Sequence, residues 1–180
     1  MRRFLLVLAA LAALAGCASR ETVFRPDMAL VTADAPFQTS GRLSVKVDGK
    51  GQMANFDWHH SPLRDELSVN TPIGSTVARL TRDASGVTLD ADGKTWRAPD
   101  VEALTEARLG FTLPLGNLAW WIRGRPAPGE PAAYDADGSL EQQGWRIRFT
   151  SDADHPSPYP KRVDLDRDNL SIRIVTDHWQ

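Results

Sequence analysis

Residues 41–47 have the sequence GRLSVKV, in which apolar and polar side chains alternate without a break. A period of two is typical of a β-strand with one face in a core and the other in solvent. The sequence DGKG at residues 48–51 is a turn signal, and ANFDW at residues 54–58 resumes the alternation. Together these segments predict an antiparallel β-hairpin.

Similar alternation continues on both sides of a central stretch of different character. It recurs at residues 67–69, 76–80, 87–89, 94–97, 145–149, 163–165 and 172–174. The central stretch has helical spacing instead, and it predicts one helix near residues 99–109 and another at residues 117–123. About ten or eleven strands with one apolar face each cannot stay flat, so we expect the sheet to curl or close. The helices would then lie over its mouth, and an apolar cavity would remain wherever side chains do not fill the interior.

The first residues have the pattern of an export signal. Two arginines follow Met1, and residues 4–14 are apolar, which is too short to span a bilayer. The run ends in LAGC at residues 14–17, which resembles the bacterial lipobox. We therefore expect a signal peptide at residues 1–16, with N-acyl and S-diacylglycerol groups on Cys17. Cys17 is the only cysteine, so it cannot form an internal disulfide, and lipidation accounts for it.

The residues after the cysteine predict where the protein resides. Ala18 and Ser19 follow Cys17, whereas the lipoproteins that this pattern resembles carry Asp at the second position when they stay in the inner membrane. We therefore expect anchoring in the inner leaflet of the outer membrane, with the fold facing the periplasm. Residues 17–35 are polar, and we expect a lipid-anchored flexible tether there. Residues 36–180 would form one domain, which we expect to be a monomer.

Composition and motifs argue against several classes of protein. The formal net charge is −2, and residues 1–16 hold two arginines and no acid, so the mature chain is more acidic and has no electrostatic reason to bind nucleic acid. P-loop, G-x-S-x-G and H-E-x-x-H motifs are absent, so we expect neither nucleotide hydrolysis nor catalysis. His59 and His60 would point to opposite faces of a strand, and residues 152–155 lack ligand spacing. We therefore expect a solvated strand end and a polar loop, with no metal and no cofactor besides the covalent lipid.

Several motifs, taken in order, resemble the outer-membrane lipoprotein receptor family LolB. They are GRL at 41–43, the apolar positions of 54–58, NTPIGST at 70–76, GFTLPL at 110–115, LAWWIRGRP at 118–126, QGW at 143–145 and DHW at 177–179. No single motif is diagnostic, but their order and spacing are fairly specific when combined with the lipobox. Members of that family fold as an incomplete antiparallel β-barrel whose opening is covered by helices. The resemblance therefore implies a mainly β half-barrel with two or three helices over an apolar cavity.

The resemblance also implies a function. Members of the family accept triacylated proteins from the soluble periplasmic carrier LolA and release them into the outer membrane. The expected partners are therefore LolA, lipidated client proteins and the inner leaflet of the outer membrane. The main alternative is a lipid-anchored scaffold subunit of an outer-membrane assembly machine, with a solid core and no acyl-binding cavity. A lipoprotein hydrolase is a weaker alternative because no nucleophile motif is present.

The inward positions of the strands and helices are candidates to line the acyl-chain cavity. They are Leu43, Val45, Ala54, Phe56, Trp58, Leu67, Val69, Leu80, Leu104, Leu118, Trp121, Ile122, Trp145, Ile147, Phe149, Ile172 and Ile174. The alternative interpretation is an ordinary solid core, which composition alone favours. The resemblance reverses this preference for the set, although not for each member.

One loop is expected to contact the membrane. Ile73 lies between the turn residues Pro72 and Gly74, where an apolar side chain tends to point outward. The family commonly has Leu at the matching position, so the resemblance implies a membrane-insertion loop. A lone exposed Ile is common, but in lipid it would contribute about 1.5–3 kcal/mol, enough to orient a tethered domain. In contrast, Asp164, Asp166 and Asp168 predict a solvated strand face or a contact for a basic carrier surface.

Overall fold

The computed structural model describes residues 21–24 and 35–180. Within them the chain forms one antiparallel sheet and two helices. The strands are β1 (Glu21–Val23), β2 (Phe37–Val47), β3 (Lys50–Ser61), β4 (Arg64–Asn70), β5 (Thr76–Asp83), β6 (Gly86–Ala91), β7 (Lys94–Ala98), β8 (Ala132–Tyr134), β9 (Leu140–Gln142), β10 (Trp145–Asp152), β11 (Arg162–Arg167) and β12 (Leu170–Trp179). The helices are α2 (Val101–Leu109) and α3 (Leu115–Trp121). The expected signal peptide and Cys17 lie outside the described residues.

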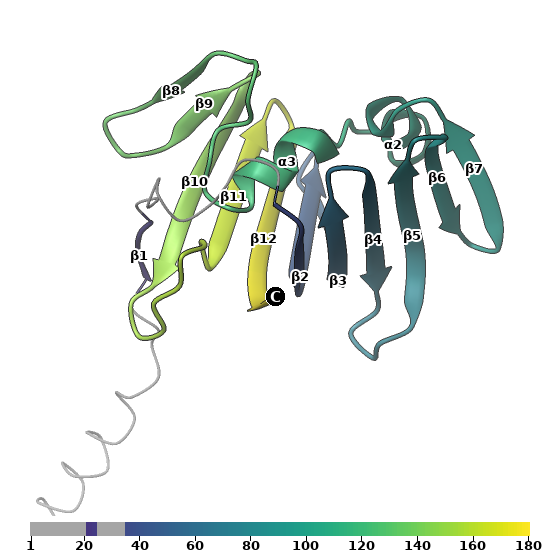
Figure 1. Ribbon diagram of the computed structural model, residues 1–180, viewed down its shortest axis with the longest axis horizontal. Coiled ribbons are helices and arrows are strands. Elements are labelled where there is room, and N and C mark those ends of the chain that lie inside the picture. Colours follow the sequence, from purple (N-terminus) through teal and green to yellow (C-terminus); the bar gives the residue numbers. More distant parts are fainter. Residues whose placement is uncertain (1–20, 25–34) are drawn as a thin grey trace, which may run out of the picture.

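The strands follow the order β7-β6-β5-β4-β3-β2-β12-β11-β10-β9-β8, and β1 pairs separately with β10 (Figure 1). Strands β7 and β8 end the order without pairing with each other, so the sheet is open. The expected incomplete antiparallel barrel is therefore confirmed. Every alternating segment of the sequence lies in a strand. The three-residue strands β1, β8 and β9 are additional, because such short segments show no usable alternation.

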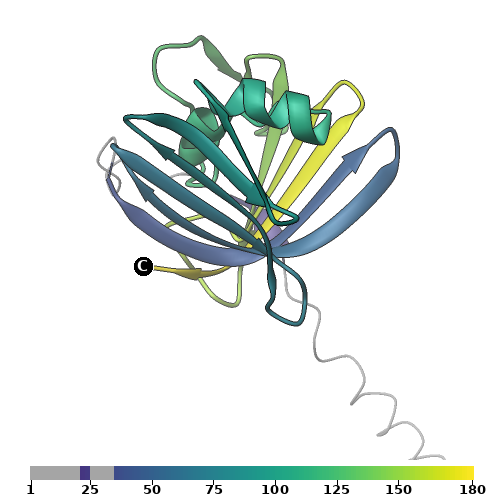
Figure 2. The ribbon, with the colours of Figure 1, turned by 90° about the vertical axis from the view of Figure 1, so that its right-hand side faces the viewer.

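The sheet curls into a deep trough, and both helices lie across its open side (Figure 2). Gly41 permits part of this curvature where β2 meets β12. A β-carbon at Gly41 would overlap the carbonyl oxygen of Val175, so only glycine allows so close an approach. The pairing register of the same two strands shifts between Thr176 and His178. Such irregularities bend a strand and increase its twist.

The two helices form where the sequence predicts them. Asp100 caps α2 by accepting a hydrogen bond of 2.7 Å from the backbone N–H of Ala103, and Gly110 ends the helix in the left-handed conformation. Helix α3 follows Pro114 and begins two residues earlier than expected. Its buried residues turn toward the sheet, so α3 covers the deepest part of the trough.

Part of the expected flexible tether is docked on the domain. Strand β1 pairs with the end of β10, from Glu21 opposite Asp152 to Val23 opposite Thr150. The next residue, Phe24, is buried and makes an edge-to-face contact with Phe149. The sequence-based expectation of a free tether across residues 17–35 is therefore wrong for residues 21–24. Strand pairing and burial of one aromatic ring explain why this segment is held.

Candidate functional site

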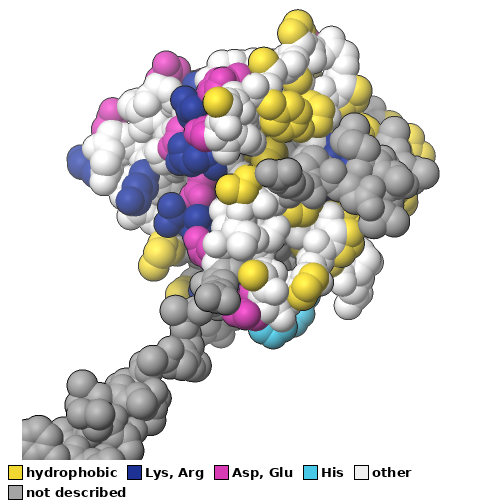
Figure 3. Space-filling view, turned by 90° about the vertical axis from the view of Figure 1, so that its left-hand side faces the viewer, with side chains coloured by type: hydrophobic (Ala, Val, Ile, Leu, Met, Phe, Trp, Pro, Cys, Tyr) yellow, Lys and Arg dark blue, Asp and Glu magenta, His cyan; other side chains and the backbone are white. Residues whose placement is uncertain are grey.

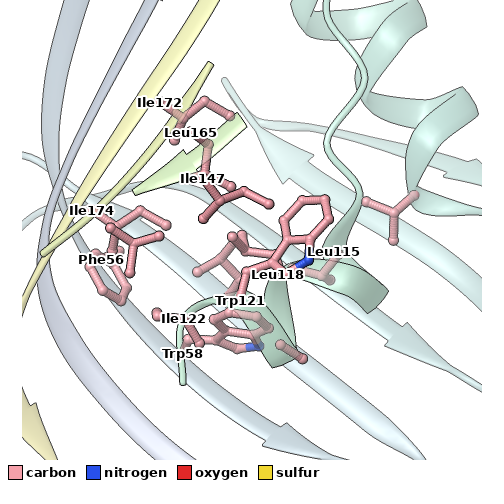
Figure 4. Packing of buried hydrophobic residues seen from close by; sticks show 14 of the residues in the cluster. Phe56, Trp58, Leu115, Leu118, Trp121, Ile122, Ile147, Leu165, Ile172 and Ile174 are labelled. Carbon is pink, nitrogen blue, oxygen red and sulfur yellow. The ribbon is translucent and has the colours of Figure 1, made fainter. Parts of the chain in front are cut away.

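The concave face of the sheet is the candidate site, and α3 covers its deepest part. Figure 4 shows side chains of α3 and the following residue pointing toward side chains of the sheet. Those from the helical side are Leu115, Leu118, Trp121 and Ile122, and those from the sheet are Phe56, Trp58, Ile147, Leu165, Ile172 and Ile174. All of them are buried. Under α3 the trough is therefore filled by the protein's own side chains.

One buried polar side chain holds α3 and the following loop in place. The Gln142 Oε1 atom accepts hydrogen bonds of 2.8 Å from the Trp121 indole and from the backbone N–H of Ala127. Its Nε2 atom donates to the carbonyl oxygens of Ala127 at 2.8 Å and Glu130 at 3.2 Å. These four bonds connect β9, α3 and the loop after α3. We call this arrangement the Gln142 latch.

Beyond α3 the concave face remains partly open. We call this region the apolar strip, and it comprises the partly buried residues Leu43, Val45, Val47, Ala54, Val69 and Ala78. Leu43 lies opposite Ile174, and Val45 lies opposite Ile172. Direct cross-strand partners share one face of a sheet, so the strip continues the buried cluster toward solvent. An apolar ligand could therefore touch the strip before any helix moves.

The expected cavity residues divide between these two regions. Leu43, Val45, Ala54 and Val69 belong to the apolar strip, and the others are buried in the core cluster. Sequence reasoning missed Leu115, because the second helix was expected to begin at residue 117. It also missed Leu165, although that residue lies in an alternating segment. Gln142 gave no signal, because a glutamine beside Glu141 and Gln143 in a polar stretch does not indicate burial.

Two surface hollows lie on either side of His60. One has a volume of about 370 Å³ and is lined by Phe37, His59 and Arg64 among others, and the other has about 400 Å³ and is lined by Arg82, Asp100 and neighbouring residues. Neither is lined by any residue that was expected to line the acyl-chain cavity. The second hollow has a mainly polar lining, which does not suit an alkyl chain.

A buried network around Asp65 fixes this rim of the sheet. The Asp65 carboxylate accepts hydrogen bonds of 2.9 Å from the Trp58 indole and 2.6 Å from Arg82 Nε, and it lies 2.7 Å from His60 Nδ1. Burial alone would raise the pKa of Asp65, but the hydrogen bonds with His60, Trp58 and Arg82 outweigh it and lower the pKa below 3.8. The expected solvated strand end is therefore correct for His59 but wrong for His60, which is buried.

The described residues contain no cluster of three or more His, Cys, Asp or Glu side chains placed to hold a metal ion. In the same part of the chain, no helix has the length and apolar character needed to cross a membrane.

The turn between β4 and β5 carries the expected membrane-insertion residue. Thr71 closes this turn: its carbonyl oxygen accepts 2.9 Å from the Gly74 N–H, and its own N–H donates 2.8 Å to the Ser75 carbonyl oxygen. Pro72 and Gly74 are exposed, and Ile73 is 89% exposed. A closed turn of this kind presents Ile73 to the surroundings without support from the core.

The expected acidic face is neutralised within the fold. Asp164 forms ion pairs with Arg162 at 2.9 Å and Arg173 at 2.5 Å, and Asp166 pairs with Arg148 at 2.7 Å. Figure 3 shows basic and acidic side chains interleaved on this side of the molecule. Asp168 lies in the turn after β11. These carboxylates therefore do not form an uncompensated patch for a basic partner.

Sequence comparisons with known proteins assign the chain to a family. The sequence model of the family described as "Outer membrane lipoprotein LolB" matches residues 35–179. The chain belongs to the LolB family. An outer-membrane lipoprotein LolB from Chromobacterium violaceum is 58% identical over 181 residues, which cover 100% of this chain and 99% of that protein. One from Neisseria meningitidis is 39% identical over 77% of this chain and 71% of its own length. These relationships confirm the expected family and the expected location as an outer-membrane lipoprotein.

Among solved structures, a LolA superfamily protein from Nitrosomonas europaea is similar, with a TM-score of 0.49 and 8% sequence identity. The match covers 83% of this chain and 87% of that one.

Proposed function

We propose that this LolB-family protein receives triacylated lipoproteins from the soluble periplasmic carrier LolA and inserts them into the outer membrane without nucleotide hydrolysis. The observation that carries the proposal is the apolar strip, which continues the α3-covered core to the surface. Each acyl methylene that leaves an apolar site for water costs about 0.8 kcal/mol, so a chain moves readily only between adjoining apolar surfaces. Leu43 and Val45 would be the first such surface.

Further entry of an acyl chain requires α3 to move. The side chains of Leu118, Trp121 and Ile122 occupy the space that an alkyl chain would take. Displacing them exposes the apolar residues of the sheet, and the entering chain replaces the lost contacts. The Gln142 latch opposes this motion, so it would keep the core closed until a client arrives. Transfer then depends on relative affinity and not on an energy source.

A fatty-acid displacement assay on the full chain tests acceptance. Val45→Asp places a charge in the apolar strip, whereas Lys46→Asp changes the neighbouring exposed residue on the other face of β2. We expect Val45→Asp to weaken fatty-acid binding at least tenfold and Lys46→Asp to leave it unchanged. Equal binding by both variants would contradict acceptance at the strip.

The turn of Ile73 would serve the delivery step. Inserted into lipid, one isoleucine contributes about 1.5–3 kcal/mol, which is enough to orient an anchored domain but not to hold it. We expect Ile73→Glu to retain folding and acceptance from the carrier but to slow delivery to liposomes. Leu63→Glu is the matched control, because Leu63 is 81% exposed in the turn at the other end of β4. If Ile73→Glu delivers clients at the wild-type rate, Ile73 is only a turn residue.

The filled interior under α3 favours a second candidate, a lipid-anchored scaffold subunit with a solid core. Such a protein would not bind fatty acids saturably, whereas the receptor would. Depletion in cells provides a further test. Other lipoproteins should accumulate on the soluble carrier if the protein is the receptor, and they should not if it is a scaffold.

A further inference from the structure

The docked segment at residues 21–24 shortens the path between the lipid anchor and the domain. Three residues separate Cys17 from Glu21. A fully extended chain spans at most about 3.5 Å per residue, so the acylated cysteine can lie no farther than about 14 Å from the start of β1. If β1 were undocked, the path to residue 35 would allow roughly 60 Å. Docking therefore reduces the reach of the anchor about fourfold.

Several independent contacts hold this segment. Strand β1 pairs with β10 at three positions, and the N–H of Phe24 donates a hydrogen bond of 3.3 Å to the carbonyl oxygen of Phe149. Glu21 forms an ion pair of 2.5 Å with Arg162. Phe24 itself is 6% exposed, whereas the preceding Val23 is 62% exposed. Burial of one ring thus provides most of the apolar contact.

The seat of Phe24 depends on a glycine in the segment after α3. Gly124 has a φ of 78°, which a side chain disfavours. A β-carbon at Gly124 would also overlap the Phe24 ring. The residue is therefore suited both to the turn and to the ring. Gly124 lies within residues 35–179, which the family model matches, whereas Phe24 precedes them.

The docking of residues 21–24 also determines which side of the domain the anchor reaches. Glu21 lies opposite Asp152, where β10 ends and the β10–β11 loop begins. In Figures 1 and 2 this loop and the β4–β5 turn with Ile73 project from the same lower side of the molecule. The two helices lie on the upper side in both views. Anchor and Ile73 can therefore approach one surface together.

We propose that β1 and Phe24 form a clasp that orients the domain on the bilayer, with the lipid on Cys17 and the turn of Ile73 as two separate contacts with the same leaflet. The helix-covered mouth then faces the periplasm. The use of Ile73 as the second contact rests on the proposed function, whereas the docking of β1 does not. The partner of this surface is the lipid bilayer itself.

The test uses the full-length acylated protein in phosphatidylethanolamine–phosphatidylglycerol vesicles that contain a nitroxide-labelled lipid. A fluorophore is attached at Ser75→Cys on the lower side or at Leu109→Cys at the end of α2. We expect quenching at position 75 to exceed quenching at position 109 at least threefold. Phe24→Ser should bring this ratio close to one, and the exposed neighbour Val23→Ser should leave it unchanged.

A second pair of variants does not depend on the stability of the seat. A ten-residue Gly-Ser linker between Arg20 and Glu21 lengthens the path to the clasp and should abolish the difference between the two labels. The same linker between Ala29 and Leu30 lies beyond the clasp and should preserve the difference. Equal effects of the two linkers would overturn the clasp. If Ile73→Glu still slows delivery in that case, the proposed function stands without it.

Discussion

Replacement of Gln142 by leucine tests the latch that closes the core. Gln142 is 2% exposed and makes four hydrogen bonds, three of 2.8 Å and one of 3.2 Å. A net value of about 1 kcal/mol per bond gives roughly 4 kcal/mol, and leucine regains about 1 kcal/mol through apolar packing. We expect the free energy of unfolding to fall by about 3 kcal/mol.

Urea unfolding at neutral pH measures this loss. With a slope of roughly 2 kcal/mol per molar urea, the midpoint should fall by about 1.5 M. Hydrogen exchange should show the largest loss of protection in α3, and fluorescent fatty acids should bind faster because α3 is released. The control is Glu141→Gln on the opposite face of β9, where a half-exposed ion pair of 3.7 Å with Arg146 contributes little.

Two results would refute the reasoning about the latch. If the midpoint shifts by no more than in the Glu141→Gln control, the four bonds do not hold α3. If stability falls as expected but α3 keeps its protection and fatty acids bind no faster, then Gln142 supports the fold without controlling access.

Other substitutions test separate parts of the structure. The lowered pKa of Asp65 means that its stabilisation is complete above its unfolded value near 3.8 and is lost as the pH falls through the lower folded value. Asp65→Asn should lower the free energy of unfolding by about 2–4 kcal/mol at pH 7. It should also make this free energy fall less steeply as the pH drops from 7 into the acidic range, as measured by urea unfolding at a series of pH values. Trp145→Phe should cost roughly 1 kcal/mol less than Trp58→Phe, because among the described residues the buried indole N–H of Trp145 has no hydrogen-bond partner. Gly41→Ala should lower the midpoint strongly through its clash with β12, whereas Gly116→Ala, with open space around it, should raise stability by up to about 1 kcal/mol.

The sequence predicts the central strands well because each one has a core face and a solvent face. The alternation of residues 41–47 gives the strand, and its cross-strand partners follow from the turn at residues 48–51. The same logic fails for β1, whose three residues are all exposed, because pairing to a strand edge leaves no periodic trace. It also fails for β8, which is equally short and exposed.

The candidate site was predicted only in part, for a different reason. Periodicity identifies Leu118 and Ile174 as inward-facing, but it cannot tell whether inward side chains meet one another or line a space. That distinction depends on where α3 lies, which Gln142 fixes through hydrogen bonds to residues 12 to 21 positions earlier in the chain. The exposure of Ile73 was foreseeable, because turn residues surround it.

The position of β12 at the centre of the sheet has a consequence for synthesis and export. Strand β2 pairs with β12, so that Leu43 lies opposite Ile174, while β2–β7 and β8–β12 form separate meanders on either side. A chain that emerges amino end first can complete the earlier meander long before residues 170–179 appear. Until then β2 is a bare edge that invites aggregation. Joining the halves requires closure of a very long loop, which is slow. The nascent protein would therefore need protection through this interval, and a truncation before β12 would leave two half-sheets that cannot unite.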